Sequence, residues 1–243
     1  MSAPLLSIDG ISKSFRGLRA VYRASLEVPQ GSIVSLIGPN GAGKTTMFNM
    51  AAGVFRPDEG SISFDGRRID GLRPDQICHA GIGRTFQIVK PFKELTALEN
   101  VLVGALRAER DVRLARRKAE VVLDRLGMLE KRSQPAAQLT LPERKRLEVA
   151  RALATDPKLL LLDEVMAGLR PTETDRMVKI LVELNRSTGL TIVLIEHVMR
   201  AVMALAQRVL VLHHGAVIAQ DVPSVVVRDP AVVKSYLGTE AVH

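Results

Sequence analysis

The sequence contains very little cysteine and few aromatic residues. Cys78 is the only cysteine among 243 residues, so a disulfide within the chain is excluded and a reducing compartment fits. Aromatic residues make up 3% of the chain and tryptophan is absent. A core must therefore be built from aliphatic side chains, which suits helices packed on a parallel sheet.

Long apolar runs are also missing. The uninterrupted apolar stretches, such as residues 159–162 and 201–206, are far too short for a membrane-spanning helix. The first residues lack the basic stretch followed by a long apolar run that marks a secretory signal. These two absences predict a chain that lies in the cytosol or is peripheral to a membrane.

The formal net charge is +8, which by itself suggests nucleic acid or an anionic membrane surface as a partner. The basic residues are spread along the chain, with one dense run at residues 107–132. No aromatic-rich RNA-binding pattern accompanies them. We therefore interpret the excess mainly as solvated helix surface.

Hydrophobic patterning predicts an α/β fold with a mainly parallel sheet. Residues 5–15 and 21–28 alternate apolar and polar positions, which predicts an N-terminal antiparallel β subdomain. Further strands and helices are expected along the rest of the chain. Strands are expected at 32–37, 60–64, 158–162, 190–196 and in a hairpin of 208–213 with 216–219; helices are expected at 44–52, 147–153, 172–186 and 198–206 and within 95–131. A single domain over residues 1–243 follows, with a helical subdomain at about 90–155.

A glycine-rich turn lies between the expected strand at 32–37 and the helix at 44–52. Residues 38–45 read GPNGAGKT and match the GxxxxGK(S/T) motif. The glycines let backbone N–H groups converge on phosphate oxygens, Lys44 supplies positive charge, and the Thr45 hydroxyl ligates magnesium. The core of this fold is therefore that of a P-loop NTPase. The residues expected to bind nucleotide here are Asn40, Gly41, Ala42, Gly43, Lys44, Thr45 and Thr46.

Two further strands end in residues suited to the chemistry of a bound triphosphate. Four leucines precede Asp163 and Glu164, and ligands gather at such strand ends in open α/β sheets. We expect Asp163 to hold the metal and Glu164 to polarise an attacking water as general base. His197 follows the strand at 190–196, where it is placed to bond the γ-phosphate and hold the water with Glu164.

This set of residues resembles the ATP-binding subunit of ABC transporters over residues of about 5–237. The resemblance implies ATP and Mg²⁺ as cofactors. It implies that Gln87, in the segment RTFQ, senses the metal and contacts a membrane subunit, and that His197 is the switch histidine. It also implies that Phe15 stacks on adenine, with Tyr22 as the rival for that role.

Within the family the chain looks most like the ATPases of branched-chain amino acid importers. The stretches that carry this likeness are residues 38–46, 85–87, 163–169, 196–197 and 233–238. The resemblance implies a peripheral protein on the cytoplasmic face of the inner membrane. It implies membrane permease subunits and a second ATP-binding subunit as partners, and a solute-binding protein as an indirect one.

The family's signature LSGGQ is degenerate in this sequence, where residues 139–143 read LTLPE. Leu141 adds a side chain where a phosphate must approach the backbone, and Pro142 has no N–H to donate. Thr140 and Glu143 nevertheless have the spacing of a capping box, which would preserve the helix start. Arg170 also replaces a residue that is usually acidic or small and polar. These departures predict a heterodimer with two unequal sites, although a homodimer stays open.

Two other functions remain open at this point. One is a soluble ATPase of the same fold that acts on nucleic acid, although no nucleic acid is expected because the chain has neither a coiled-coil insertion nor a second cassette. The other is a nucleotide-binding regulator without turnover. The degenerate signature favours the regulator, whereas Glu164 and His197 argue against it.

Overall fold

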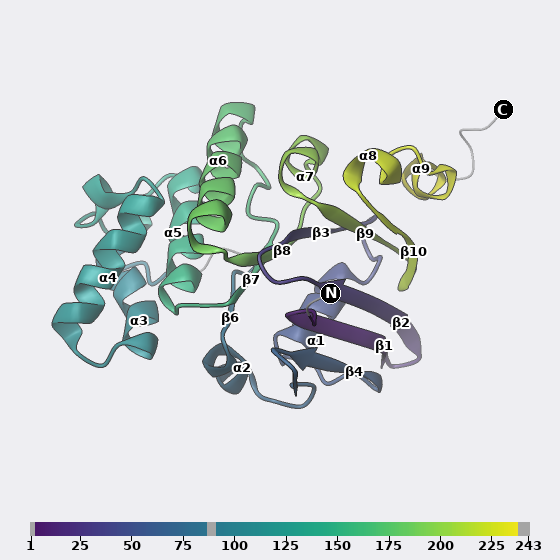
Figure 1. Ribbon diagram of the computed structural model, residues 1–243. Helices are drawn as coiled ribbons and strands as arrows, with labels where there is room; N and C mark the ends of the chain where they lie inside the picture. Colours follow the sequence, from purple (N-terminus) through teal and green to yellow (C-terminus); the bar gives the residue numbers. More distant parts are fainter. Residues whose placement is uncertain (1–2, 87–90, 238–243) are drawn as a thin grey trace.

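The computed structural model describes residues 3–86 and 91–237. Its smaller sheet is antiparallel, with the strand order β2-β1-β4-β5 (Figure 1). The strands are β1 (Leu6–Phe15), β2 (Leu18–Val28), β4 (Glu59–Phe64) and β5 (Arg67–Arg68). The antiparallel N-terminal β subdomain expected from the alternating pattern is confirmed.

The larger sheet has the strand order β10-β9-β3-β8-β7-β6. All its neighbours pair in parallel except β10, which forms the expected hairpin with β9. A short β6 was not expected, because three residues are too few to show a periodic pattern. The strands are β3 (Ile33–Ile37), β6 (Ile82–Arg84), β7 (Leu159–Asp163), β8 (Thr191–Ile195), β9 (Arg208–His213) and β10 (Ala216–Asp221).

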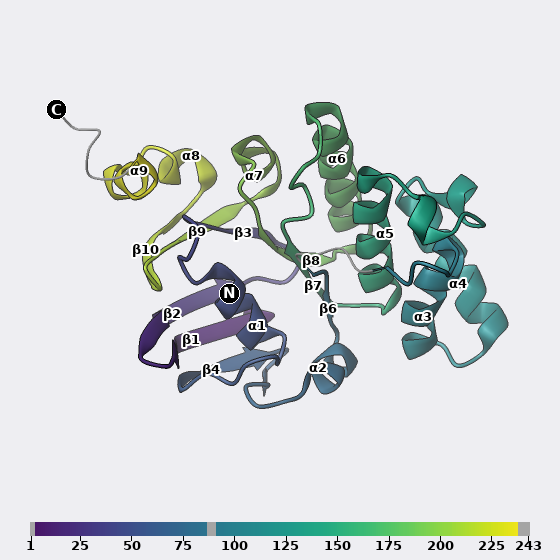
Figure 2. The same ribbon diagram turned by 180° about the vertical axis from the view of Figure 1, so that it is seen from behind.

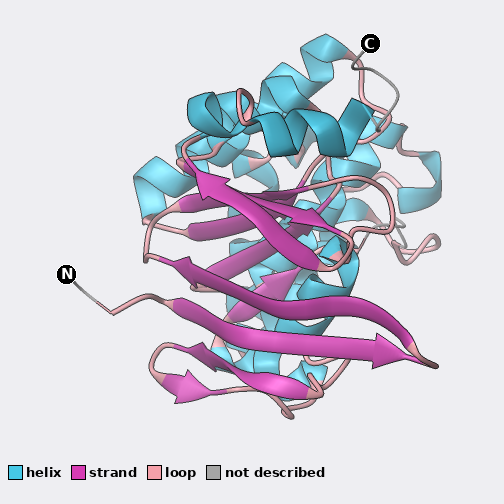
Figure 3. Ribbon diagram, turned by 90° about the vertical axis from the view of Figure 1, so that its right-hand side faces the viewer, coloured by secondary structure: helices cyan, strands magenta, loops and turns pink. Residues whose placement is uncertain are grey.

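The four leucines of β7 are explained by cover on both faces of the larger sheet. Leu160 and Leu162 belong to a hydrophobic cluster shared with the helices, and Leu159 and Leu161 to one shared with the antiparallel sheet. Figure 3 shows the two sheets one above the other, with helices over the upper one. Because successive side chains of a strand point to opposite faces, a strand buried on both faces loses its polar alternation.

The helices fall at or near the positions expected for most of them. They are α1 (Lys44–Ala51), α2 (Pro74–Ala80), α3 (Ala97–Ala108), α4 (Val112–Arg125), α5 (Leu141–Ala154), α6 (Pro171–Thr188), α7 (Met199–Leu205), α8 (Pro223–Val226) and α9 (Pro230–Leu237). Sequence patterning missed α2, α8 and α9. No helix among the described residues is long and apolar enough to cross a bilayer.

The helices α3, α4 and α5 pack together at the end of the molecule farthest from α8 and α9 (Figures 1 and 2). The helical pattern expected within residues 95–131 is divided between α3 and α4. The division is set by Asp111, whose carboxylate accepts hydrogen bonds from the N–H groups of Arg113 and Leu114 at 2.8 and 3.3 Å. An N-cap of this kind starts a new helix within an otherwise continuous pattern.

Candidate nucleotide site

Three parallel strands bring the expected site residues to one edge of the larger sheet. Ile195 of β8 lies between Leu36 of β3 and Asp163 of β7 in the strand register. The glycine-rich turn follows β3, Glu164 follows β7, and His197 lies just beyond β8. Residues separated by more than 100 positions therefore meet at the carboxyl ends of these strands, where ligands bind in α/β sheets.

The glycine-rich turn requires glycine where its backbone passes close to other strands. A Cβ on Gly38 would lie 2.1 Å from the carbonyl oxygen of Leu212, and one on Gly43 would lie 2.3 Å from that of Ala20. Gly43 is also the N-cap of α1, and no side chain of the described residues caps this helix. The N–H groups of the first helical turn are left for an anion, which the helix dipole favours.

A cavity of about 670 Å³ opens over this turn and the start of α1. Its volume is in the range of small-molecule sites. The cavity is lined by Leu18, Arg19, Ala20, Asn40, Gly41, Ala42, Gly43, Lys44, Thr45, Thr46, Glu164 and His214. All seven residues expected from the GxxxxGK(S/T) motif therefore share one wall with Glu164. The motif gave no signal for Leu18–Ala20 or His214, because these reach the cavity from the start of β2 and from the β9–β10 turn.

Lys44 is buried beneath the glycine-rich turn. Its Nζ donates hydrogen bonds to the carbonyl oxygens of Gly38 at 2.7 Å and Pro39 at 2.9 Å. Burial lowers the pKa of Lys44, and the negative charges of Glu164 and Asp163 act against that change. The ammonium group is thus held where it can exchange carbonyl partners for phosphate oxygens, a stronger charge-assisted interaction.

Asp163 is fully buried, and neither of its carboxylate oxygens has a hydrogen-bond partner among the described residues. The nearest cation is Arg84, whose Nη2 lies 3.8 Å from Oδ2. Burial raises the pKa of Asp163, and Arg84 opposes the rise. A buried carboxylate without hydrogen-bond partners is costly unless another group compensates its charge.

Magnesium fits this environment. Mg²⁺ in phosphate sites is held by one or two carboxylates together with hydroxyl, water and phosphate oxygens. Asp163 supplies the carboxylate, and Thr45 brings a hydroxyl to the cavity. Within the described part of the chain no group of three or more His, Cys, Asp or Glu residues is arranged to hold a metal. A carboxylate and a hydroxyl together suit a metal that is bound jointly with a phosphate ligand.

Glu164 and His197, which were expected to hold the attacking water together, are in direct contact. His197 Nε2 lies 2.8 Å from Glu164 Oε1. The backbone of Glu164 has a left-handed φ of 50°, and its N–H donates to the carbonyl of Ile195 at 3.0 Å. A non-glycine residue in this region is strained, and such strain is found at functional sites.

Glu196 supports this region but was not singled out from the sequence. It is buried, and its Oε1 accepts a hydrogen bond from the N–H of Met166 at 2.9 Å. Burial raises the pKa of Glu196 to about 7. The residue therefore links the segment after β8 to the segment after β7. Only the folded structure reveals it, because an acidic residue at a strand end carries no distinct pattern.

The expected aromatic contact with adenine is not part of the cavity wall. Phe15 packs edge-on against Phe55, with the ring centroids 5.1 Å apart. The guanidinium carbon of Arg19 lies 4.3 Å from the centroid of the Tyr22 ring. Neither aromatic lines the cavity, so the role of Phe15 stays a prediction. Gln87 lies outside the described residues, and its role also stays a prediction.

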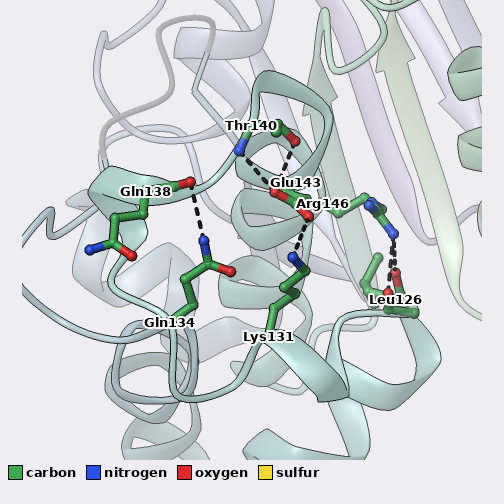
Figure 4. Close-up of polar contacts among 8 residues, drawn as sticks. Leu126, Lys131, Gln134, Gln138, Thr140, Glu143 and Arg146 are labelled. Carbon is green, nitrogen blue, oxygen red and sulfur yellow. Dashed lines mark hydrogen bonds and ion pairs between the residues drawn. The ribbon is translucent and has the colours of Figure 1, made fainter.

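Residues 139–143 lead into α5, and the carboxylate of Glu143 is turned back onto Thr140 of the same segment. The capping box expected at Thr140 and Glu143 is confirmed: the Glu143 carboxylate accepts bonds from the Thr140 N–H at 2.8 Å and hydroxyl at 2.9 Å. Lys131 Nζ lies 3.4 Å from the other carboxylate oxygen (Figure 4). Burial alone would raise the pKa of Glu143, but these bonds and Lys131 lower it.

Leu141 and Arg146 are also engaged within the chain. A Cβ on Gly168 would lie 3.3 Å from Leu141 Cδ2, so this leucine covers the loop after Glu164. Arg146 donates to the carbonyls of Leu126 and Gly127 at 3.3 and 3.2 Å (Figure 4). The helix start is preserved, and Pro142, which has no N–H, lies in its first turn.

The fold and the glycine-rich turn define a P-loop nucleotide-binding cassette, and known proteins agree. The sequence matches the ABC transporter family over residues 21–167. It is 40% identical to the high-affinity branched-chain amino acid transport ATP-binding protein LivG of Salmonella typhimurium, over 98% of this chain and 99% of LivG.

Solved structures show the same relation. The ADP conformation of an ATP-binding cassette of an ABC transporter is 31% identical, with a TM-score of 0.89 and coverage of 98% of this chain and 100% of that one. A dimeric cassette in a post-hydrolysis state, bound to ADP and Pi, is 25% identical. Its TM-score is 0.82, with coverage of 90% of this chain and 98% of that one. The chain belongs to the ABC transporter family, as an ATP-binding subunit with the ATPase cassette fold.

Proposed function

We propose that this chain hydrolyses Mg-ATP at the cavity over α1 to energise the import of branched-chain or related amino acids. The observation that carries the proposal is the meeting of three features at one sheet edge: Lys44, the buried carboxylate of Asp163 and the Glu164–His197 pair. The Asp163 carboxylate has no hydrogen-bond partner among the described residues. We further propose that residues 1–243 form one nucleotide-binding domain, with a helical subdomain at about 90–155.

Each residue would contribute a separate part of the chemistry. The N–H groups around Gly41 and Gly43, together with Lys44, would bind and orient the phosphates. Glu164 would accept the proton of the attacking water, and His197 would hold the water and the γ-phosphate. Asp163, Thr45 and Gln87 would hold Mg²⁺, which when bound neutralises developing charge on the phosphate oxygens.

The cargo and setting follow from relatives named for branched-chain amino acid transport. We propose membrane permease subunits as partners, a solute-binding protein as an indirect one, and a place on the cytoplasmic face of the plasma membrane. The test is ATP-dependent uptake of labelled leucine into proteoliposomes that contain the assembled complex. Uptake that stops with a non-hydrolysable ATP analogue is expected; uptake that is equal with and without ATP would contradict the proposal.

A groove of about 500 Å³ offers a place for a membrane subunit to dock. It lies among α2, β6, α3 and α5, with mostly apolar walls and Phe86 exposed at its edge. Arg84 Nε and Nη1 and Glu148 Oε2 are buried in its lining without hydrogen-bond partners among residues 3–86 and 91–237. Burial raises the pKa of Glu148 to about 7. We propose that a segment of the permease fills the groove and satisfies these groups.

We also propose that the chain pairs with a different ATP-binding subunit, with a homodimer as the alternative. In the family dimer, the signature of each subunit faces the nucleotide of the other. Here Pro142 cannot donate an N–H, and Glu143 and Leu141 are engaged within the chain. This arrangement leaves one competent site, formed by the phosphate loop of this chain and an intact signature of the partner.

Unequal sites predict that hydrolysis depends on the partner. We expect phosphate release by the purified chain alone to be at least about tenfold slower than by the pair, because loss of one set of phosphate donors costs roughly that much or more. Colorimetric phosphate release at equal chain concentration is the measurement. A rate for the chain alone that equals the rate of the pair would show that two copies suffice.

A further inference from the structure

Lys145 is a buried lysine that takes no part in the wall of the nucleotide cavity. It lies in the second turn of α5 and is 5% exposed. Its Nζ donates a hydrogen bond to the backbone carbonyl oxygen of Glu164 at 2.8 Å. An ammonium group is expensive to bury, so its presence here calls for partners that compensate it.

The surroundings of Lys145 are acidic on several elements. Burial raises the pKa of Asp163 on β7, of Glu148 on α5 and of Glu196 after β8, and the charge of Lys145 acts against each rise. Arg84 on β6 contributes a second positive charge at Asp163. Lys145 therefore compensates negative charge from three segments that converge behind the nucleotide cavity.

The bond from Lys145 reaches Glu164 at a strained point of the backbone. Glu164 has a φ of 50°, in the left-handed region. Its N–H is held by Ile195 of β8, and its carbonyl by Lys145 of α5. Two bonds on opposite sides of one residue fix the direction of its Cα–Cβ bond. The carboxylate of the same residue lies 2.8 Å from His197 Nε2.

We propose that Lys145 is a positioning residue, which clamps the backbone of Glu164 and thereby aims the carboxylate at the attacking water. This inference rests on the proposed role of Glu164 as general base. Lys145 does not contact nucleotide. It acts through Glu164, by keeping a left-handed conformation that would otherwise relax.

The hydrogen bond from Lys145 also connects Glu164 to α5, a helix that takes part in two other proposed contacts. α5 begins at the degenerate signature segment and carries Glu148 in the lining of the proposed permease groove. Lys145 lies between these two points on the same helix. A shift of α5 relative to β7 would therefore be transmitted to Glu164 through one buried hydrogen bond.

The test is Lys145→Met in the complex assembled with its membrane and partner subunits. Methionine keeps the length and apolar stem of the side chain and removes the donor and the charge. We expect kcat for ATP hydrolysis to fall about 10- to 100-fold, because displacing a catalytic group by about 1 Å reduces the rate by a factor of that order. The Kd for Mg-ATP, measured by calorimetry, is expected to stay within about threefold, because the phosphate loop is unchanged.

Two further variants and a stability measurement make the outcome decisive. Lys145→Arg keeps a cationic donor and is expected to recover more than half of the lost rate. Lys118→Met, on α4 and paired with Asp156 at 3.3 Å, is the matched control and should leave kcat unchanged. Melting temperatures of all variants separate misplacement from unfolding, because an unfolded chain would lose binding and kcat together.

The variant Glu164→Gln separates this inference from the proposed function. If Glu164→Gln abolishes hydrolysis and Lys145→Met leaves kcat intact, the clamp is refuted and the general base stands. If Glu164→Gln hydrolyses ATP normally, the proposed role of Glu164 as general base fails, and the clamp fails with it. A fall in kcat for Lys145→Met that Lys145→Arg does not relieve at all would also overturn the clamp, because a cationic donor would then be irrelevant.

Discussion

Glu164→Gln is expected to reduce ATP hydrolysis by roughly 10²- to 10⁴-fold while ATP stays bound. Glutamine has the shape of glutamate and keeps a hydrogen-bond partner for His197, whose Nε2 now lies 2.8 Å from Glu164 Oε1. It cannot accept the proton of the attacking water. The loss corresponds to about 3–5 kcal/mol of transition-state stabilisation.

Single-turnover hydrolysis of radiolabelled ATP in the assembled complex measures this effect, together with retention of ATP after gel filtration. Binding should be equal or tighter, since a negative charge is removed beside the phosphates. Glu183→Gln, on the exposed face of α6, is the control and should behave like the unchanged protein. Normal turnover by Glu164→Gln would point to a different general base, whereas no turnover by the unchanged protein would favour a regulator.

Lys44→Ala is expected to weaken Mg-ATP binding by about 100-fold. Lys44 is the buried cation of the cavity wall, and its Nζ lies 2.7 Å from the Gly38 carbonyl. A charge-assisted hydrogen bond to phosphate contributes about 1.5–3 kcal/mol, and one or two such bonds are lost. The tenfold step for every 1.4 kcal/mol gives the expected change in Kd.

Isothermal titration calorimetry with Mg-ATP measures the change. Lys44→Met retains the apolar stem and tests whether packing under the turn matters, so both variants should lose affinity alike if charge is responsible. Lys179→Ala, on the exposed surface of α6, removes a lysine far from the turn and should bind normally. An unchanged Kd for both Lys44 variants would remove the basis of the proposed site.

The sequence was most informative where a function requires consecutive residues. The phosphate loop is one contiguous motif, because a turn that cradles phosphates must be glycine-rich and must join a strand to a helix. Asp163 and Glu164 were predicted in the same way, as acidic residues directly after a buried strand. In the structure Asp163 is buried, and Glu164 is in contact with His197.

Residues that carry no local pattern of their own were not predicted. Lys145 and Glu196 have no local pattern, since a lysine in a polar helix start and a glutamate at a strand end are common features. The walls from Leu18 and His214 depend on how two hairpins pack against α1. Phe15 was named by resemblance, and its ring packs on Phe55 outside the cavity lining.

By itself, the sequence determined the fold class, the phosphate loop, the acidic strand end and the weakened signature segment. The first three depend on periodicity and local chemistry, and the last depends on the resemblance to the family's signature. The tertiary structure decided what Lys145 binds and how Glu143 is turned inward. It also decided that Asp163 has no hydrogen-bond partner among the described residues. Such features depend on contacts between β7, β8 and α5, which are brought together only when hydrophobic burial assembles the sheet and the helical subdomain.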